Sequence, residues 1–169
     1  MIVITKKAVA YFCVAAALAV CCSNAWAADH VGEVAAIHAA DQDWLKGYNS
    51  GDVDTVVSLY GEDAVLLPPG ASSAHGRTAI RAFFEKDMAA SAKDGIKFSL
   101  GAKPDGGVSG DMGWSSGTYT VKDKSGLVVD TGKYLSVSRK KDGKWLYVRD
   151  TWNSDGPPAS AGSAAPPKK

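Results

Sequence analysis

One carboxylate in the sequence lies where an apolar side chain is expected. Val34, Ile37, Trp44 and Tyr48 follow helical spacing, and Asp41 falls on the same face of that helix. A carboxylate on an apolar face is costly unless it is paired or meets water. In a pocket, loss of solvation raises the pKa of a carboxyl, which suits the group to general acid/base chemistry. Asp41 is therefore the leading candidate for a catalytic residue.

A structural role for Asp41 stays open at this stage. Its side chain could form an ion pair with an arginine or lie at the edge of the helix, and structural ion pairs also perturb carboxyl pKa values. The candidate partners are Arg77, Arg81 and Arg149.

Asp150 is the second carboxylate of interest. In the last predicted strand it alternates in step with Leu146, Val148 and Trp152, which indicates the interior face. The residues of opposite parity are then expected on the outer face: Trp145, Tyr147, Arg149 and Thr151. Two carboxyls facing one interior would allow one ionised base and one protonated donor, with a tyrosine hydroxyl beside them. Tyr48 and Tyr119 are the candidates for that hydroxyl.

Histidines supply one further candidate. His75 lies in the loop before the third predicted helix, where it could shuttle protons at the mouth of a pocket, although a solvated loop residue is the commoner situation. His30, His38 and His75 show no HxH or HExxH spacing, so no metal site is expected. Asp105-Gly106-Gly107 indicates a turn rather than a phosphate loop, and no cofactor is expected.

Aromatic side chains suggest a cavity for a flat apolar ligand. Nine Trp and Tyr residues follow residue 27, and such residues favour wet pockets and interfaces over dry cores. The expected ligand-binding residues are Trp44, Trp114, Tyr119, Tyr134 and Trp152. Trp114 and Tyr119 have opposite parity in one predicted strand, so both face inward only if a bulge intervenes near Gly117.

The elements that must position these residues indicate an α+β fold. Helical spacing covers residues 33–48, 53–60 and 78–92. A short buried strand at 64–67 is followed by alternating segments at 96–100, 114–121, 127–138 and 145–152, with hairpin turns at 122–126 and 140–143. Helices that cover one face of a curved antiparallel sheet leave a natural pocket between the two layers.

The two ends indicate export and a tail. Lys6-Lys7, an apolar run over residues 8–22 and Ala25-Trp26-Ala27 predict a secretory signal peptide of residues 1–27. A lipid anchor on Cys21 or Cys22 is the minority alternative, because neither cysteine follows a residue typical of a lipoprotein signal. The expected location is therefore periplasmic or secreted, with no membrane contact after cleavage. Residues 156–169 are rich in Pro, Ala, Gly and Ser and are expected to be disordered, which leaves one domain at 28–155.

Charge and cysteine content exclude several classes of protein. Lys6 and Lys7 are two of the 19 basic residues, so 17 basic and 18 acidic residues remain after cleavage. No basic patch stands out, and nucleic acid is not an expected partner. The three cysteines precede residue 27, so the mature chain has neither a disulfide nor a thiol nucleophile.

Several short segments together carry a family resemblance. They are Asp41-Gln42-Asp43-Trp44, Tyr48-Asn49-Ser50-Gly51-Asp52, Leu59-Tyr60-Gly61-Glu62-Asp63-Ala64-Val65, Pro68-Pro69-Gly70, Gly76-Arg77 with Ile80, Gly117-Thr118-Tyr119, Gly132-Lys133-Tyr134, Asp142-Gly143-Lys144-Trp145 and Asp150-Thr151-Trp152-Asn153. The chain from Val34 to Ser154 resembles the SnoaL-like branch of the nuclear transport factor 2-like superfamily, and especially its SgcJ/EcaC-type subgroup.

The resemblance implies a cone in which three helices close over a strongly bent, mainly antiparallel sheet and the interior binds ligands. Relatives include ketosteroid isomerase, scytalone dehydratase and polyketide cyclases. Relatives often pair through the outer sheet face, so a homodimer is expected, with Trp145, Tyr147 and Thr151 at the interface.

Fold alone does not fix function, and three hypotheses follow. The first is an exported protein that binds a small apolar ligand. The second is an isomerase, dehydratase or cyclase that uses pocket carboxylates for proton transfer on a small carbonyl compound. The third is a non-catalytic dimeric interaction module. Whether Asp41 and Asp150 point into one cavity discriminates between them.

Overall fold

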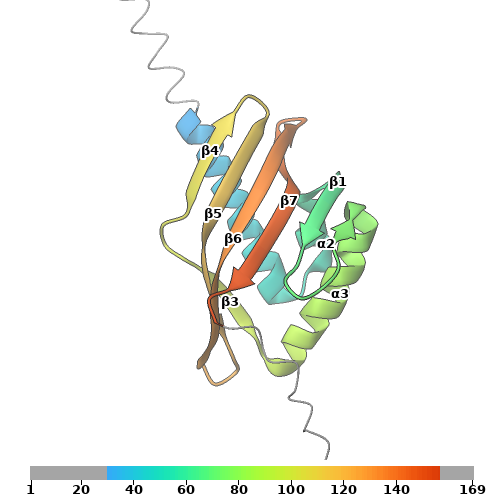
Figure 1. Ribbon diagram of the computed structural model, residues 1–169, viewed down its shortest axis with the longest axis vertical. Coiled ribbons are helices and arrows are strands. Elements are labelled where there is room, and N and C mark those ends of the chain that lie inside the picture. Colours follow the sequence, from blue (N-terminus) through green and yellow to red (C-terminus); the bar gives the residue numbers. More distant parts are fainter. Residues whose placement is uncertain (1–29, 157–169) are drawn as a thin grey trace, which may run out of the picture.

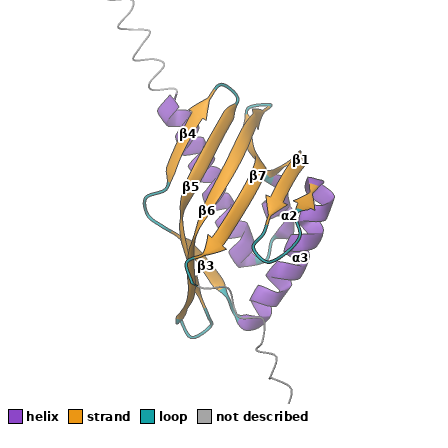
Figure 2. Ribbon diagram, in the orientation of Figure 1, coloured by secondary structure: helices purple, strands orange, loops and turns teal. Residues whose placement is uncertain are grey.

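The computed structural model describes residues 30–156 as three helices and a sheet of seven strands. All three helices lie on one face of a curved sheet (Figures 1 and 2). The predicted α+β cone is therefore confirmed. The predicted signal peptide and the tail beyond residue 156 lie outside the described residues.

Local sequence signals set the helix ends. The N-terminal helix covers residues 30–50, and α2 covers Val53–Ser58. Asp52 caps α2, because its Oδ1 accepts the backbone N–H of Thr55 at 2.9 Å. The long helix α3 covers Gly76–Asp94 and ends at Gly95, which adopts the left-handed conformation with φ of 67°. Within residues 30–156 no helix is both long and apolar enough to cross a membrane.

The sheet is mixed and mainly antiparallel. Its strands run in the order β2-β1-β7-β6-β5-β3, and β4 pairs with the other half of the β5 edge. Among the strands of residues 30–156, only β1 and β7 pair in parallel. The bounds are β1 Tyr60–Leu67, β2 Ala74–His75, β3 Lys97–Leu100, β4 Asp105–Ser109, β5 Met112–Lys122, β6 Val128–Lys141 and β7 Lys144–Ser154.

Strand β4 corrects the expected turn at Asp105-Gly106-Gly107. Gly106 and Gly107 pair with Ser115 and Trp114 of β5. A Cβ atom at Gly107 would lie 2.7 Å from Nε1 of Trp114, so the missing side chain lets the indole cover the backbone of β4. The turn prediction was wrong because this glycine pair serves close packing in a strand.

A bulge in β7 changes which residues face the helices. Val137 of β6 pairs with Arg149 while Ser138 pairs with Tyr147, which leaves Val148 as an extra residue. Tyr147 and Asp150 consequently face the same side, although they have opposite parity. The expected outward positions of Trp145 and Tyr147 were wrong: they are 6% and 3% exposed.

Strand β5, in contrast, pairs with β6 without a shift from Met112 to Val121. Trp114 and Tyr119 therefore lie on opposite faces of the sheet. Tyr119 is buried under the helices, whereas Trp114 is 37% exposed on the outer face. No bulge at Gly117 reconciles the two residues, and the inward placement of Trp114 was wrong.

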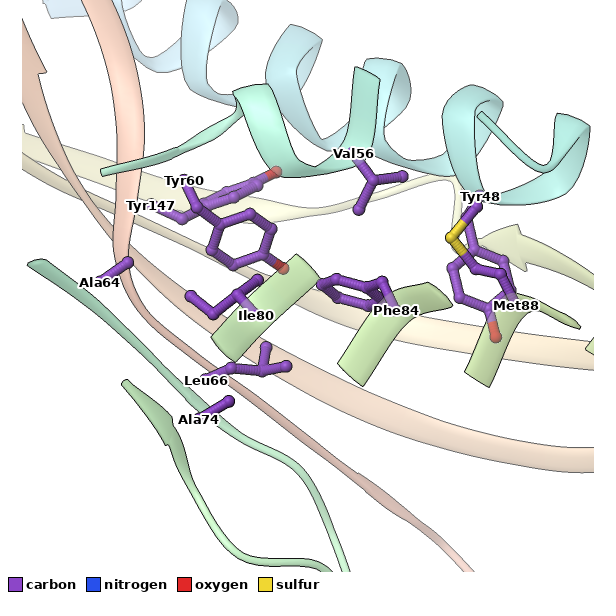
Figure 3. Close-up of a cluster of buried hydrophobic side chains, with 10 residues drawn as sticks. All are labelled: Tyr48, Val56, Tyr60, Ala64, Leu66, Ala74, Ile80, Phe84, Met88 and Tyr147. Atoms are coloured by element: carbon purple, nitrogen blue, oxygen red, sulfur yellow. The ribbon is translucent and has the colours of Figure 1, made fainter. Parts of the chain in front are cut away.

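The main hydrophobic cluster lies between the helices and the parallel half of the sheet. Figure 3 shows Phe84 in the middle of this cluster, with Tyr48 and Met88 toward one end and Tyr60 and Tyr147 toward the other. This cluster holds the N-terminal helix and α3 against β1 and β7.

Candidate functional site

A cavity of about 160 Å³ lies between the inner face of the sheet and two helices, the N-terminal helix and α3. Three of its lining residues carry a carboxyl, and none is a lysine, arginine or histidine. The lining residues are Asp41, Trp44, Tyr48, Phe84, Asp87, Ser91, Phe98, Leu100, Tyr119, Tyr134, Ser136, Tyr147, Asp150 and Trp152.

Asp41 reaches this cavity from the N-terminal helix and is only 5% exposed. Its Oδ1 accepts the hydroxyl of Tyr147 at 2.7 Å and that of Ser115 at 3.1 Å. Its Oδ2 accepts only the hydroxyl of Tyr134, at a long 3.3 Å. Oδ2 is therefore the less engaged oxygen of this carboxyl.

No arginine of the described residues pairs with Asp41, so the ion-pair alternative does not apply. Arg77 binds Glu62 at 2.6 Å, and Arg81 binds Asp54 at 2.6 Å. Arg149 donates to a backbone carbonyl.

Asp150 faces the same cavity from β7 and is 8% exposed. Its Oδ2 accepts the hydroxyl of Tyr60 at 2.5 Å, and its Oδ1 accepts that of Ser136 at 2.8 Å. The Tyr60 oxygen in turn accepts the indole N–H of Trp44 at 3.2 Å. Both oxygens of Asp150 are thus held in place, and a chain of hydrogen bonds links it to the N-terminal helix.

Burial dominates the electrostatics of these two carboxyls. Loss of solvation raises the pKa of Asp41, and the hydroxyls of Tyr147 and Ser115 offset this only in part. Burial likewise raises the pKa of Asp150 against the hydroxyls of Tyr60 and Ser136, and the charge of Asp41 raises it further. The charge of His38 also lowers the pKa of Asp41, but burial prevails, so the two carboxyls retain protons to higher pH than exposed ones.

The two buried tyrosines that bond to these carboxyls, Tyr60 and Tyr147, are hydrogen-bond donors. Burial raises the pKa of Tyr60 and Tyr147 well above the ordinary value for tyrosine, and the nearby carboxylates add to the effect. Both hydroxyls therefore keep their protons at neutral pH. Tyr60 and Tyr147 are suited to stabilising negative charge rather than to accepting protons.

A separate polar group of Tyr48, Asp87 and Ser91 lies where α3 meets the cavity, which we call the helix end. The hydroxyl of Tyr48 donates to Oδ2 of Asp87 at 2.5 Å and lies 2.9 Å from Oγ of Ser91. Asp87 and Ser91 come from α3 and are half-buried. Burial raises the pKa of Tyr48, and Asp87 adds to that rise.

Aromatic rings form the walls between the two ends. The rings of Trp44 and Tyr48 stack with centroids 5.0 Å apart, and Phe98 meets Tyr48 edge-on at 4.8 Å. Phe84 closes the same group from α3. These walls are apolar and suit a flat ligand.

Two glycines in the sheet make room for the tyrosines of the cavity. Gly117 pairs with Tyr134 and Gly132 pairs with Tyr119 across β5 and β6. A Cβ atom would lie 2.8 Å from the Tyr134 ring at Gly117 and 2.3 Å from the Tyr119 ring at Gly132. Each ring lies over the glycine of the neighbouring strand, which explains the two Gly-x-Tyr segments in physical terms.

The structure brings most of the expected site residues together. The expected residues that line the cavity are Asp41, Trp44, Tyr48, Tyr119, Tyr134, Asp150 and Trp152. Trp114 lies on the outer face. His75 is exposed before α3, with its Nε2 3.0 Å from Oγ of Ser73, and it does not line the cavity. His75 lies in strand β2, where it pairs with Val65 of β1 at the edge of the sheet, and not in a loop at the mouth of the cavity.

Sequence reasoning missed several polar residues of the site. Tyr60 and Tyr147 hold the carboxyls, but the bulge at Val148 hides the facing of Tyr147. Ser115 and Ser136 had a usable signal, because each shares strand parity with a tyrosine of the cavity. Asp87 and Ser91 had none, because the pattern of α3 does not reveal which of its edges meets the cavity.

Within the part of the chain that the structure describes, no group of three or more His, Cys, Asp or Glu side chains is arranged to hold a metal ion.

Comparison with known proteins places this geometry in a family. The sequence profile of the SnoaL-like domain matches residues 42–148. No curated protein sequence shows significant similarity to the chain.

Solved structures agree on the fold. An NTF2-like protein with a cystatin-like fold from Novosphingobium aromaticivorans is 25% identical, with a TM-score of 0.65 over 73% of this chain and 83% of the other. An NTF2-like protein of unknown function from Pseudomonas putida gives a TM-score of 0.67 at 16% identity, over 82% of this chain and 98% of the other. A ketosteroid isomerase-like protein from Erwinia carotovora atroseptica gives a TM-score of 0.57 at 23% identity, over 74% and 98%.

Proposed function

The chain belongs to the SnoaL-like domain family, and from this premise we propose that it binds a small, flat, largely apolar carbonyl compound and moves a proton on it. The reaction type is that of an isomerase, dehydratase or cyclase. One observation carries the proposal: two buried carboxyls that form no salt bridge within the described residues, Asp41 and Asp150, line one aromatic cavity.

Asp41 is the proposed base. Its Oδ2 is the least engaged carboxyl oxygen at this end of the cavity, and the raised pKa of Asp41 makes its carboxylate a stronger base than an exposed one. A C–H bond next to the substrate carbonyl breaks as an O–H bond forms on Asp41. The electron pair moves to the carbonyl oxygen. The proton held by Asp41 exchanges with solvent, and Asp41 returns a proton to carbon in a later step.

Donors for the resulting enolate oxygen surround the same space. The hydroxyls of Tyr134 and Tyr147 donate to Asp41 before the reaction. As Asp41 takes up the substrate proton, these hydroxyls turn to the developing enolate oxygen, and Asp150 becomes a donor when it is protonated. Preorganised donors aimed at developing negative charge supply a large part of such catalysis. The coupled carboxyls favour one ionised and one protonated group, which is the division of roles that this chemistry needs.

The size of the cavity limits the substrate. A cavity of about 150 Å³ accepts benzene in another protein, so about 160 Å³ suits a single-ring compound. Phenylacetone, an aromatic ketone with acidic protons beside its carbonyl, is an appropriate probe.

Proton exchange tests the proposal without knowledge of the natural substrate. Phenylacetone in deuterated buffer should lose its α-proton NMR signals faster with the protein than without it. Asp41→Asn keeps the shape of the side chain and should lower this rate about 10²-fold or more at similar affinity. Asp43→Asn, an exposed change on the same helix, is the matched control and should exchange like the wild type.

Binding without chemistry is the competing function. Phenylacetone would then bind to the wild type and to Asp41→Asn alike, and exchange would proceed at the buffer rate in both. An equal, accelerated rate in both proteins would instead show that Asp41 is not the base.

We also propose that the protein is exported after cleavage of its signal peptide and that it forms a homodimer. N-terminal sequencing of exported protein should begin at Ala28, whereas a lipid-modified Cys21 or Cys22 would contradict cleavage after Ala27.

The outer sheet face would form the dimer interface. Of the residues first expected there, Thr151 lies on this face beside Leu67 and Leu135, whereas Trp145 and Tyr147 do not. Leu67, Trp114 and Leu135 are 43%, 37% and 46% exposed on this face. Leu135→Lys should shift the light-scattering mass from dimer to monomer, and Val129→Lys at the β5–β6 hairpin should not. A monomeric wild type would contradict the pairing.

A further inference from the structure

We infer that the ligand carries a positively charged nitrogen, held at the helix end of the cavity by Asp87. This inference rests on the proposed function in one respect, that the cavity is the ligand site, and it is independent of the proton transfer at Asp41. It narrows the proposed aromatic carbonyl compound to one that also carries an amine.

The charge of the cavity wall is the first argument. Asp41, Asp87 and Asp150 line the cavity, and no basic side chain does. Of the basic residues of α3 that precede Asp87, Lys86 is exposed and does not line the cavity, and Arg81 is engaged in ion pairs with Asp54 and Glu85. A negatively charged ligand would therefore meet only repulsion, whereas a cation would relieve the repulsion among the carboxyls.

The hydrogen bonds at Asp87 are the second argument. Tyr48 donates its single hydroxyl proton to Oδ2 of Asp87. In the hydrogen bond between the Tyr48 hydroxyl and Oγ of Ser91, the donor must therefore be Ser91. Within residues 30–156, Oδ1 of Asp87 accepts no hydrogen bond. This end of the cavity thus offers a ligand two acceptors, Oδ1 of Asp87 and Oγ of Ser91, and no free donor. An ammonium group has donors only and matches this arrangement.

The aromatic rings beside Asp87 are the third argument. Trp44, Tyr48, Phe84 and Phe98 contact one another in stacked and edge-on pairs and all line the cavity. In Figure 3 the Tyr48 ring lies near Phe84 and Met88, at the far end of the cluster from Ala64. Aromatic faces attract cations, and most strongly where water is excluded. A carboxylate beside such rings recognises an amine better than it recognises a neutral hydroxyl.

The cavity volume limits the amine to a single ring. Benzylamine, benzyl alcohol and benzoate share one ring and differ in the charge of the attached group, so they serve as cationic, neutral and anionic probes. Calorimetry on the full chain at neutral pH should show benzylamine binding at least about tenfold more tightly than benzyl alcohol, with no detectable binding of benzoate.

Two variants locate the cation. Asp87→Asn should remove most of the preference for benzylamine and leave the affinity for benzyl alcohol nearly unchanged. Asp94→Asn makes the same charge change at an exposed position of the same helix and should keep the full preference. Unfolding curves of both variants check that they fold, and the comparison of the three probes on the wild type needs no variant.

The other outcomes separate this inference from the proposed function. Equal affinities for benzylamine and benzyl alcohol overturn the cationic ligand and leave the cavity as a site for neutral compounds. A preference for benzylamine that survives in Asp87→Asn overturns the role of Asp87 and places the cation beside Asp41 or Asp150. If none of the three probes binds, both the inference and the cavity as ligand site are wrong.

Discussion

At the sheet end of the cavity, Asp41 and Asp150 are less than a tenth exposed and together accept hydrogen bonds from five hydroxyls. At the helix end, Asp87 is half-buried and accepts one. The first pair lies in a desolvated wall that supplies fixed donors, and the pKa of each carboxyl is raised. The second group lies near solvent and keeps one oxygen unengaged.

This difference suits one end of the cavity to proton transfer and the other to ligand recognition. Fixed donors around a buried carboxyl hold it in one geometry and tune its basicity, as proton transfer requires. A carboxylate with an unengaged oxygen beside aromatic rings is suited to recognition. Three tyrosine-to-phenylalanine changes compare the two ends, because each removes only a hydroxyl.

The largest effect is expected for Tyr60→Phe. This change removes the donor to Asp150 and the acceptor of the Trp44 indole in a fully buried place. We expect the free energy of unfolding to fall by about 2–3 kcal/mol, because a buried acceptor and a donor lose their partner. Urea unfolding measures it, and a loss below that of Tyr48→Phe would contradict the contrast between the two ends.

Tyr147→Phe should have an intermediate effect. Asp41 loses its shortest hydrogen bond but keeps the hydroxyls of Ser115 and Tyr134. We expect a loss of about 1–2 kcal/mol by the same measurement, together with slower proton exchange on phenylacetone. Unchanged exchange would show that the Tyr147 hydroxyl does not serve the reaction.

Tyr48→Phe should have the smallest effect on stability. Asp87 is half-buried, so water can replace the lost hydroxyl. We expect a loss below about 1 kcal/mol in the urea experiment. A change of 2 kcal/mol or more, roughly the value for a buried unsatisfied group, would show that the helix end is as closed as the sheet end.

The pH dependence of stability sharpens the comparison. The folded pKa of Asp150 is raised, so its contribution to stability is fully present below the unfolded value and is lost as pH rises through the folded value. Asp150→Asn removes this loss. The free energy of unfolding of the variant should therefore rise relative to that of the wild type as pH rises from about 4 toward neutrality.

Asp155 supplies a control of opposite sign. Its pKa is lowered by Lys133, so its contribution is present above the unfolded value and is lost as pH falls. The free energy of unfolding of Asp155→Asn should therefore fall relative to that of the wild type as pH rises. Urea unfolding at several pH values measures both variants, and parallel pH profiles for the two would contradict the burial of Asp150.

The sequence was sufficient where elements are regular. Asp41, Trp44 and Tyr48 share one face of an uninterrupted helix, so spacing alone placed them on one wall. Tyr119 and Tyr134 were expected in the cavity from the abundance of aromatic residues, whereas strand parity alone did not decide between Tyr119 and Trp114. The order of helices and strands and the family resemblance predicted the fold.

Sequence reasoning failed where one residue breaks the period. The bulge at Val148 shifts parity along β7, so Trp145 and Tyr147 were expected outside and lie inside. Alternation of apolar residues carries no signal for such a bulge, because both faces of β7 bear aromatics. Whether Asp87 faces the cavity depends on the rotation of α3 about its axis against the sheet, which is set by tertiary packing and not by helical spacing.

Carbon-13 NMR over a range of pH measures the titration of the Asp41 and Asp150 carboxyls themselves. We expect both to titrate above the ordinary value of about 3.9, and each titration to shift when the other residue is changed to asparagine. If both carboxyls titrate independently at or below about 3.9, they are neither buried nor coupled, and the cavity does not hold the acid/base pair proposed here.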